Sequence, residues 1–448
     1  MKLDRLLLVW FGFLLSLEQG FTVVLGYLSG GIARGADVIM PVDLTMYALL
    51  LLKPSRPFPK KYRGLYNFAK FGAIAYWLWS VTGEFVALEP ADFRFAYVHL
   101  SRAILVFFVV LTRVTSRDDV IQFTKGVLYA LGFQAFIGVW QWQIGPVSLP
   151  FFEITNTWRS TGTIGVANAY GSYLAALAPL AIRVSLFLNI KPKWLWHIIS
   201  ALSLGALLAS YTRGAWLGFA GAMVLFFYMD FIKKKLSQRQ MAMLFLIIVA
   251  GTIFVSVKYG HVITHRMEDS TEAITSDHKH SRMGLAKDAI RIIRENPVMG
   301  TGLNNYRYHA DKETLGTRIV HNTYLLVTAQ QGLPGGILFV LLNFVIFGYG
   351  FRILKSKDPV IYHLGVAGMT GMLAFLVYYM VAPDYRLVIL KLQHWRALAM
   401  VVAMLGVEER TKLLRARLQR KRKQLKTAQL GQGRMPWTEP DETVTQKY

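Results

Sequence analysis

Long apolar segments alternate with short polar connections along most of the chain. An apolar segment of roughly 17 to 25 residues is long enough to cross a bilayer as a helix. Segments of this kind lie at residues 6–28, 36–53, 66–83, 97–113, 122–144, 168–189, 194–211, 213–231, 241–258, 320–351, 360–381 and 387–406. The pattern therefore predicts an all-α polytopic membrane protein with about twelve transmembrane helices.

Composition supports this fold class. Of the 448 residues, 54% are hydrophobic, and the mean hydropathy of +0.37 is too high for an ordinary water-soluble globule. The absence of cysteine excludes disulfides, thiolate metal sites and cysteine nucleophiles. The opening MKLDRLLLVWFGFLLSLEQG resembles a signal peptide, but no small-residue cleavage site follows, so an uncleaved first span is expected.

Basic residues occupy every second connection and predict the orientation of the chain. They lie at Lys53, Arg56, Lys60, Lys61, Arg63, Arg113, Arg117, Lys191, Lys193, Lys233, Lys234, Lys235, Arg239, Arg352, Lys355 and Lys357. The positive-inside rule places these connections and both termini in the cytoplasm. The formal charge of +24 then reflects cytoplasmic loops beside lipid and does not indicate nucleic-acid binding.

Two domains follow from this topology. Residues 1–407 form a transmembrane domain with one large outward loop at 259–319, and residues 408–448 form a basic cytoplasmic tail, as a helix on the lipid surface or a solvated extension. Within the large loop, the segment LAKDAIRIIREN has the apolar spacing of a short surface helix. The NPVMGTG that follows it should end that helix.

The polar residues that topology does not explain all fall on the outward side. They are Arg159, Arg213, Arg282, Arg318, His321 and Arg386, with Asn168 and Asn322 nearby in the sequence. Several arginines without a matching set of carboxylates suit a phosphate or diphosphate, because each guanidinium offers planar, bidentate hydrogen bonds. Arg213 could equally be an arginine that snorkels at the membrane boundary.

A metal or other cofactor is not expected. Apart from the adjacent Glu268 and Asp269, the outward segments hold no acidic pair spaced to bind a metal ion, and their histidines lack the spacing of a zinc site. His321 has two interpretations. An imidazole can accept a proton from a hydroxyl near neutral pH, but a histidine before an apolar run can also belong to a helix start that Asn322 caps.

Four motifs, in order, resemble the O-antigen ligase and polymerase superfamily. They are RSTGTIGVANAYGSYLAALAP at 159–179, SYTRGAW at 210–216, SRMGLAKDAIRIIRENPVMGTGLNNY at 281–306, and HNTYLL at 321–326 followed by QQGLPGG at 330–336. The resemblance covers roughly residues 155–380. Members of this superfamily are membrane glycosyltransferases that act on polyprenyl-diphosphate-linked glycans outside the bacterial inner membrane.

The resemblance implies a GT-C-like fold of about twelve helices with a periplasmic loop over the donor site. It implies that Arg213 and Arg282, with Arg159 as a third, bind the diphosphate of an undecaprenyl-diphosphate glycan. His321 would be the base that activates a lipid A-core hydroxyl, and Asn322, Asn168 and Tyr324 would support the site. The implied reaction is inverting transfer without a metal.

Two alternatives stay open. A polymerase would use the same donor chemistry with a second lipid-linked repeat as acceptor, although the single uninterrupted loop before His321 favours a ligase. A polysaccharide or lipid transporter, or a flippase, would also have about twelve helices. Such a protein should show charges or helix breaks near mid-span in paired halves, whereas the unusual residues here gather at the outer boundary.

Overall fold

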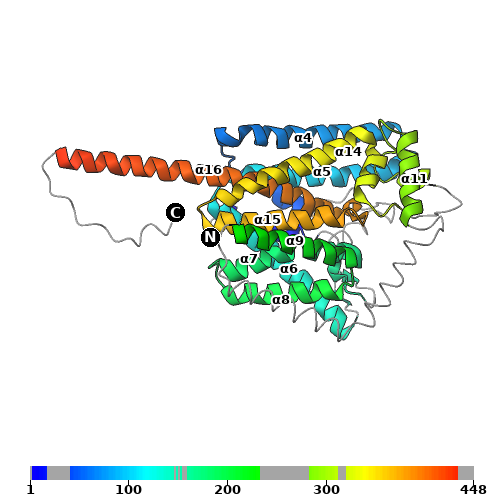
Figure 1. Cartoon of the computed structure of the whole chain (residues 1–448), viewed down its shortest axis with the longest axis horizontal. Coiled ribbons are helices and arrows are strands. Elements are labelled where there is room, and N and C mark those ends of the chain that lie inside the picture. The colour runs from blue at the N-terminus through cyan, green and yellow to red at the C-terminus, as the bar shows by residue number, and fades with distance from the viewer. Residues whose placement is uncertain are drawn as a thin grey trace.

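The computed structural model describes residues 3–17, 41–145, 148–149, 152–153, 159–232, 282–310 and 319–431. Most of these residues form helices that run along one common axis (Figure 1). The long helices are α1 (Leu3–Leu14), α3 (Pro41–Leu52), α4 (Arg63–Val81), α5 (Pro90–Arg113), α6 (Arg117–Ile144), α7 (Ala167–Phe187), α8 (Lys193–Ala209), α9 (Arg213–Ile232), α14 (Thr323–Gly350), α15 (Pro359–Tyr378) and α16 (Val388–Gly431).

Shorter elements connect these helices. They are the helices α11 (Arg282–Glu295) and α12 (Tyr306–His309), the 3-10 turns η2 (Lys60–Tyr62), η3 (Thr82–Phe85), η4 (Gly162–Ile164), η5 (Phe351–Lys355) and η6 (Asp384–Arg386), and a hairpin of β1 (Ser148–Leu149) and β2 (Phe152–Glu153). Helix α11 lies across one end of the bundle (Figure 1). The helix predicted from LAKDAIRIIREN is therefore present, and it ends before the predicted stop.

Seven helices of the described chain are long and apolar enough to cross a membrane, namely α5, α6, α7, α9, α14, α15 and α16. Helices α3 and α8 are apolar but shorter. The prediction of a multi-pass helical membrane protein is confirmed in this form. The predicted span at 241–258 lies outside the described residues.

The predicted first span, 6–28, is not one unbroken helix. Helix α1 ends at Leu14, and at about 1.5 Å per residue its length of about 18 Å is well short of a bilayer core. Buried glutamines of other helices donate hydrogen bonds to the carbonyl groups that follow the end of α1. Gln393 donates to the carbonyl of Leu15 at 3.2 Å, and Gln134 donates to that of Ser16 at 2.8 Å. Hydropathy alone cannot reveal such an end, because the partners are distant in sequence.

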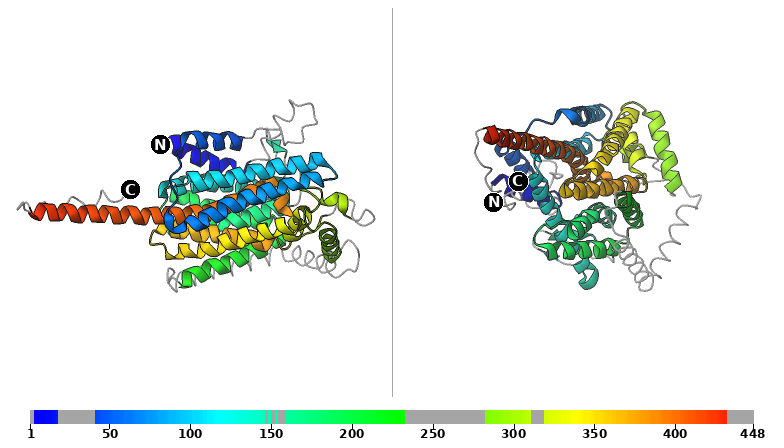
Figure 2. Two further views of the ribbon diagram at one scale, coloured as in Figure 1. Left: turned by 90° about the horizontal axis from the view of Figure 1, so that it is seen from above. Right: turned by 60° about the vertical axis from the view of Figure 1, so that its left-hand side comes forward.

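Two other boundaries differ from the predictions. Helix α5 begins at Pro90, seven residues before the predicted span at 97–113, because Pro90 occupies the first helical turn and polar residues follow it. Helix α16 does not end near residue 406 but continues through the basic segment to Gly431. Figure 1 and the left-hand view of Figure 2 show it projecting from the bundle, so residues 408–431 extend the last apolar helix.

Charged side chains gather at the end of the bundle from which α16 projects. Lys53 pairs with Asp119 at 2.7 Å, and Asp358 accepts from both Arg117 and Arg415, at 3.3 and 3.2 Å. Lys53 thus joins the residue after α3 to α6, and Asp358 joins the residues between η5 and α15 to both α6 and α16. We call this the basic end, and the opposite end of the bundle the distal end.

The long helices pack against one another throughout the bundle, and α15 contacts α16. Helix α15 packs against α7 and α9, while α16 packs against α5, and α14 packs against α4 and α16. Small residues allow close approach: a Cβ at Gly371 of α15 would lie 2.2 Å from the carbonyl oxygen of Ala176 in α7. Such contacts are typical of helix packing in membranes, where van der Waals contact drives association.

Helix α14 is broken at Gly332, which has φ 68° and ψ 179°. The break frees two backbone carbonyls, which accept hydrogen bonds from the connection after α11: Thr301 N–H donates to Ala329 O and Gly302 N–H to Gln330 O, both at 2.9 Å. In return, Leu333 N–H donates to Pro297 O at 2.8 Å. Residues 297–302 are thereby hydrogen-bonded to α14 at its break, and we call this segment the strap.

Replacing Gly332 with alanine should destabilise this strap. A Cβ there would lie 1.8 Å from Val298 O, and the positive φ is unfavourable for alanine. We expect the free energy of unfolding to fall by more than about 1 kcal/mol, which would be measured as a lower midpoint of thermal unfolding in detergent. Gly348→Ala is the matched control on the same helix, because nothing lies within 4 Å of its added Cβ. Equal midpoints for the two variants would refute this role.

Candidate functional site

The start of α14 lies at the distal end and is fixed by hydrogen bonds to the end of α15. Asn322 caps α14 by accepting from Leu325 N–H at 3.0 Å, and its amide donates to Met380 O at 3.1 Å. The neighbouring Thr323 donates from its N–H to Tyr379 O at 2.8 Å and from its hydroxyl to Ala382 O at 2.7 Å. The predicted cap at Asn322 is confirmed.

His321 comes immediately before this cap, and its side chain is exposed. The cap is complete without the imidazole, because Asn322 supplies the side-chain acceptor. The imidazole therefore stands at a rigid position that faces solvent. Tyr324 lies one turn further along, where its hydroxyl donates to Leu376 O at 3.0 Å and so joins α14 to α15.

Arg159 connects the segment before α7 to the turn between α8 and α9. Its Nε donates to Ser210 O at 2.9 Å, and one terminal nitrogen donates to Asn168 Oδ1 at 2.7 Å and to Thr212 Oγ1 at 3.0 Å. The Thr212 hydroxyl in turn donates to Ala167 O at 2.9 Å. These bonds hold the starts of α7 and α9 together.

Arg213 is the first residue of α9 and is half-buried. The bonds of the preceding turn therefore fix its backbone beside Arg159. The starts of α7 and α9 also point their free backbone N–H groups at this end of the bundle. Helix N-termini favour anions, so the two arginines and the two helix starts form an electropositive surface.

Asp384, in η6, is a site residue that the sequence patterns did not single out. Its carboxylate is 5% exposed and accepts a hydrogen bond from the hydroxyl of Tyr378, which also donates to Asn168 O at 3.0 Å. Burial raises the pKa of the Asp384 carboxyl above its usual range. The hydrogen bond from Tyr378 and the nearby charges of Arg386, His321 and Arg159 partly offset that rise.

Hydrogen bonds bring Asp384 together with residues that are far apart in sequence, because Tyr378 donates both to Asp384 and to the carbonyl of Asn168, which also accepts from Arg159 through its side chain. The only hint in the sequence is that Asp384 is the one acid in the short outward connection 382–386. In a sequence, a buried acid in a turn cannot be distinguished from a solvent-exposed one. Its burial depends on α14, α15 and α7 meeting at this point.

Arg282 stands apart from this group. It is the exposed first residue of α11, and within the described residues it makes no hydrogen bond or ion pair. Helix α11 is itself anchored, because Leu285, Ala289 and Ile292 pack with Val320, Leu326 and Ala329 around the start of α14. Arg318 lies outside the described residues.

The described residues contain no group of three or more His, Asp or Glu side chains placed to hold a metal ion. The arrangement at the distal end is instead a histidine, a buried carboxylate and arginines. Such a set can bind an anionic group and move a proton beside it.

Comparison with known proteins agrees with this class of membrane protein. Residues 198–340 match the family model described as O-Antigen ligase (Wzy_C), so the chain carries an O-antigen ligase domain over that range, and the resemblance seen in the motifs is confirmed there. The matched range includes Arg213, Arg282 and His321.

One similar curated protein is an uncharacterized protein of Haemophilus influenzae. It is 25% identical over 234 residues, which cover 47% of this chain and 57% of the relative. The match therefore spans little more than half the length of that relative.

Proposed function

We propose that this protein is a membrane glycosyltransferase of the O-antigen ligase type. It transfers a glycan from undecaprenyl diphosphate to a hydroxyl of the lipid A-core saccharide. The observation that supports this most strongly is a set of hydrogen bonds around the buried Asp384. Arg159 binds Asn168, Tyr378 donates to Asn168 O and to Asp384, and Thr323, two residues after His321, donates to Ala382 O. In this proposal the base His321 and the anion-binding Arg159 belong to one site, inside or next to the range that matches the O-antigen ligase model.

In the proposed site, Arg213, Arg159 and Arg282 bind the donor diphosphate. The first two stand at the starts of α9 and α7, where backbone N–H groups add to the positive potential. Arg282 approaches from α11, which lies across the end of the bundle (Figure 1). Guanidinium forks match the paired oxygens of a diphosphate, and their charge is permanent.

The proposed reaction is one in-line displacement. His321 takes the proton from the acceptor hydroxyl while that oxygen forms a bond to the anomeric carbon. The bond from this carbon to the diphosphate oxygen breaks, and the arginines stabilise the charge that grows on the leaving group. Asp384 stabilises the imidazolium that forms. One displacement inverts the anomeric configuration, and no step needs a metal.

The proposed location is the bacterial inner membrane, with both termini in the cytoplasm and the site on the periplasmic side. The supporting fact is that the described basic connections meet at the end of the bundle opposite the site. Under the positive-inside rule that end is cytoplasmic. The proposal includes the GT-C-like arrangement of about twelve helices that the resemblance implies.

The choice of acceptor separates a ligase from a polymerase. Purified protein would receive one lipid-linked glycan donor together with either a lipid A-core acceptor or a second lipid-linked repeat. We expect glycan on the lipid A-core acceptor. Elongation of the lipid-linked repeat in its place would make the protein a polymerase.

Asp384→Asn should change the pH dependence of transfer. Without the carboxylate, the protonated imidazole of His321 loses a stabilising charge, so the acid limb of the pH–rate profile moves to lower pH. The maximal rate should fall by about tenfold or more, because the imidazolium formed during reaction is less stable. In the wild type, protonation of Asp384 removes the same charge at low pH, and its raised pKa makes that loss begin above the usual aspartate range.

The control for this pH profile is Glu295→Gln. Glu295 is an exposed acid of α11 that pairs with Arg291 at 2.8 Å, away from Asp384. Its variant should keep the wild-type profile. If Asp384→Asn also keeps both the profile and the rate, the carboxylate has no part in the reaction.

A further inference from the structure

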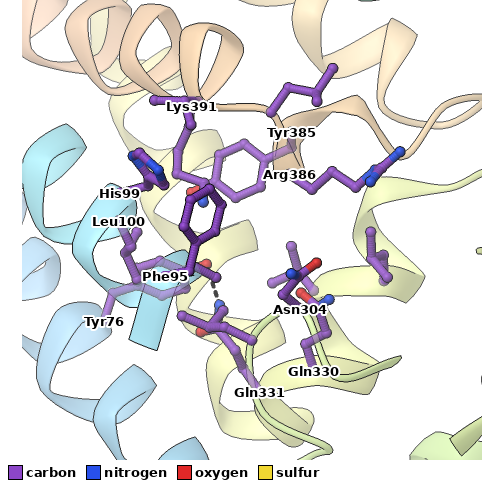
Figure 3. Close-up of a pocket in the computed structure, with 16 residues that line it drawn as sticks. Tyr76, Phe95, His99, Leu100, Asn304, Gln330, Gln331, Tyr385, Arg386 and Lys391 are labelled. Carbon is purple, nitrogen blue, oxygen red and sulfur yellow. Dashed lines mark hydrogen bonds between the residues drawn. The ribbon is translucent and has the colours of Figure 1, made fainter. Parts of the chain in front are cut away.

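A cavity of about 240 Å³ is lined in part by Tyr385 and Arg386, the two residues that follow Asp384 (Figure 3). Its walls come from α4, α5, the connection before α12, α14, and the segment from η6 into α16. The arginine surface described above belongs instead to the starts of α7 and α9. The cavity is therefore distinct from the proposed diphosphate site.

η6 and α14 lie between the cavity and the arginine surface at the starts of α7 and α9. Asp384 contacts Tyr378 on the arginine side, whereas the next residues, Tyr385 and Arg386, line the cavity. Along α14, Leu326 and Val327 line the cavity within two turns of His321. His321 does not itself line the cavity but lies five residues before Leu326 of the cavity wall.

The cavity wall is cationic. Lys391 and Arg386 lie on opposite sides of Tyr385 (Figure 3), and the described lining includes no Asp or Glu. Lys391 is 5% exposed, with its Nζ 5.8 Å from the centroid of the Tyr385 ring. A charge in such an enclosed place acts more strongly on an anion than a surface charge, because less water screens it.

One buried amide of the wall remains available to a ligand. Gln330 is 8% exposed, lines the cavity, and its side chain makes no hydrogen bond to any described residue. Its neighbour Gln331 is different, because its amide donates to the Tyr76 hydroxyl at 2.8 Å and accepts from Ser80 at 3.0 Å. The Gln330 amide can therefore hydrogen-bond to a polar ligand in the cavity.

The size and the aromatic lining define that occupant further. Tyr76, Phe95 and Tyr385 supply ring faces, and the volume is below the roughly 300–1,000 Å³ of sites that enclose larger ligands. One sugar ring suits this space better than a whole saccharide or an acyl chain. The positive charge at its wall calls for an anionic substituent on that ring.

We propose that this cavity binds an anionic sugar of the acceptor, one that carries a phosphate or carboxylate close to the hydroxyl that attacks. Lys391 binds the anionic group, Gln330 donates a hydrogen bond to the sugar, and Arg386 attracts the group at the rim. This assignment rests on the proposed function and specifies its acceptor. The acceptor approaches His321 from the cavity, while the donor diphosphate lies on the α7 and α9 side.

Transfer kinetics in nanodiscs of zwitterionic lipid test the assignment. The probes are a lipid-linked glycan donor and a lipid A-core acceptor, used either phosphorylated or after phosphatase treatment. Lys391→Met should raise the KM for the phosphorylated acceptor about tenfold or more and leave the KM for the donor unchanged. The wild type should show a similar rise when the acceptor is dephosphorylated, and Lys391→Met should no longer distinguish the two acceptors.

Two further variants keep this test decisive. Arg386→Gln changes an exposed rim residue and should give a smaller rise in acceptor KM even if Lys391→Met fails to fold. Arg94→Gln is the control, because Arg94 pairs with Glu84 at 2.6 Å on the same end of the bundle and does not line the cavity. An acceptor KM that is equal in all variants overturns the proposal.

A phospholipid headgroup would present the same chemistry. If phosphatidylglycerol in the nanodisc stabilises the wild type but not Lys391→Met, and acceptor phosphorylation has no effect on KM, the cavity binds bilayer lipid and the sugar assignment is wrong. Calorimetric binding of the acceptor without donor separates this result from a failure of the proposed function. If the wild type transfers no glycan, the proposed transferase activity is wrong. Even then, tighter binding of the phosphorylated than of the dephosphorylated acceptor, if this difference is lost in Lys391→Met, would support the assignment of the cavity to an anionic sugar.

Discussion

Replacing His321 with alanine is expected to lower the rate of glycan transfer by about 10²- to 10⁴-fold, the usual contribution of a general base. The exposed imidazole stands at a capped and doubly anchored helix start, so its removal should not disturb α14. The rate would be measured with purified protein, lipid-linked donor and lipid A-core acceptor. The affinity for the donor should stay near that of the wild type, because the arginines remain.

The control for this variant is His197→Ala. His197 is an exposed histidine of α8, near the connection to α7 and away from the distal end. Its variant should transfer at the wild-type rate. Wild-type transfer by folded His321→Ala would show that another group removes the proton.

Arg213→Lys should lose activity although it keeps the positive charge. A lysine cannot reproduce the paired hydrogen bonds of a guanidinium fork on a diphosphate. Loss of one such stabilising contact in the transition state typically costs on the order of 10²-fold in rate. The measurement is kcat/KM for the lipid-linked donor, together with the midpoint of thermal unfolding to confirm that the variant is folded.

Arg159→Lys is the companion variant, and it tests a residue with both a proposed role in diphosphate binding and a structural role. Arg159 makes three hydrogen bonds that hold the starts of α7 and α9 together. Its loss should therefore lower both activity and thermal stability. Arg94→Lys, outside the site, should change neither. Full activity in Arg213→Lys would remove that residue from the diphosphate site.

The elements that local patterns encode were predictable from the sequence. Apolar spacing predicted α11, and a cap at Asn322 was one of the two interpretations of the helix start at His321. Each of these features depends on residues close together in the chain. The arrangement of basic connections at one end follows from charge alone and was predicted as well.

Features that depend on long-range packing were not predictable. The early end of α1 rests on Gln134 and Gln393, which are more than a hundred residues away. The burial of Asp384 requires α7, α14 and α15 to meet. Likewise, hydropathy counts Lys391 as one tolerated charge in an apolar span, and only the fold shows that it lines a cavity.

The most direct test of the proposed transferase is the fate of the donor lipid during reaction. Reconstituted protein would receive a labelled undecaprenyl-diphosphate glycan and a lipid A-core acceptor, and the products would be quantified and their anomeric configuration determined by NMR. We predict one free undecaprenyl diphosphate for each glycan transferred, with inversion at the anomeric carbon. Retention of configuration, release of the monophosphate, or movement of the intact lipid-linked glycan without cleavage would contradict this account.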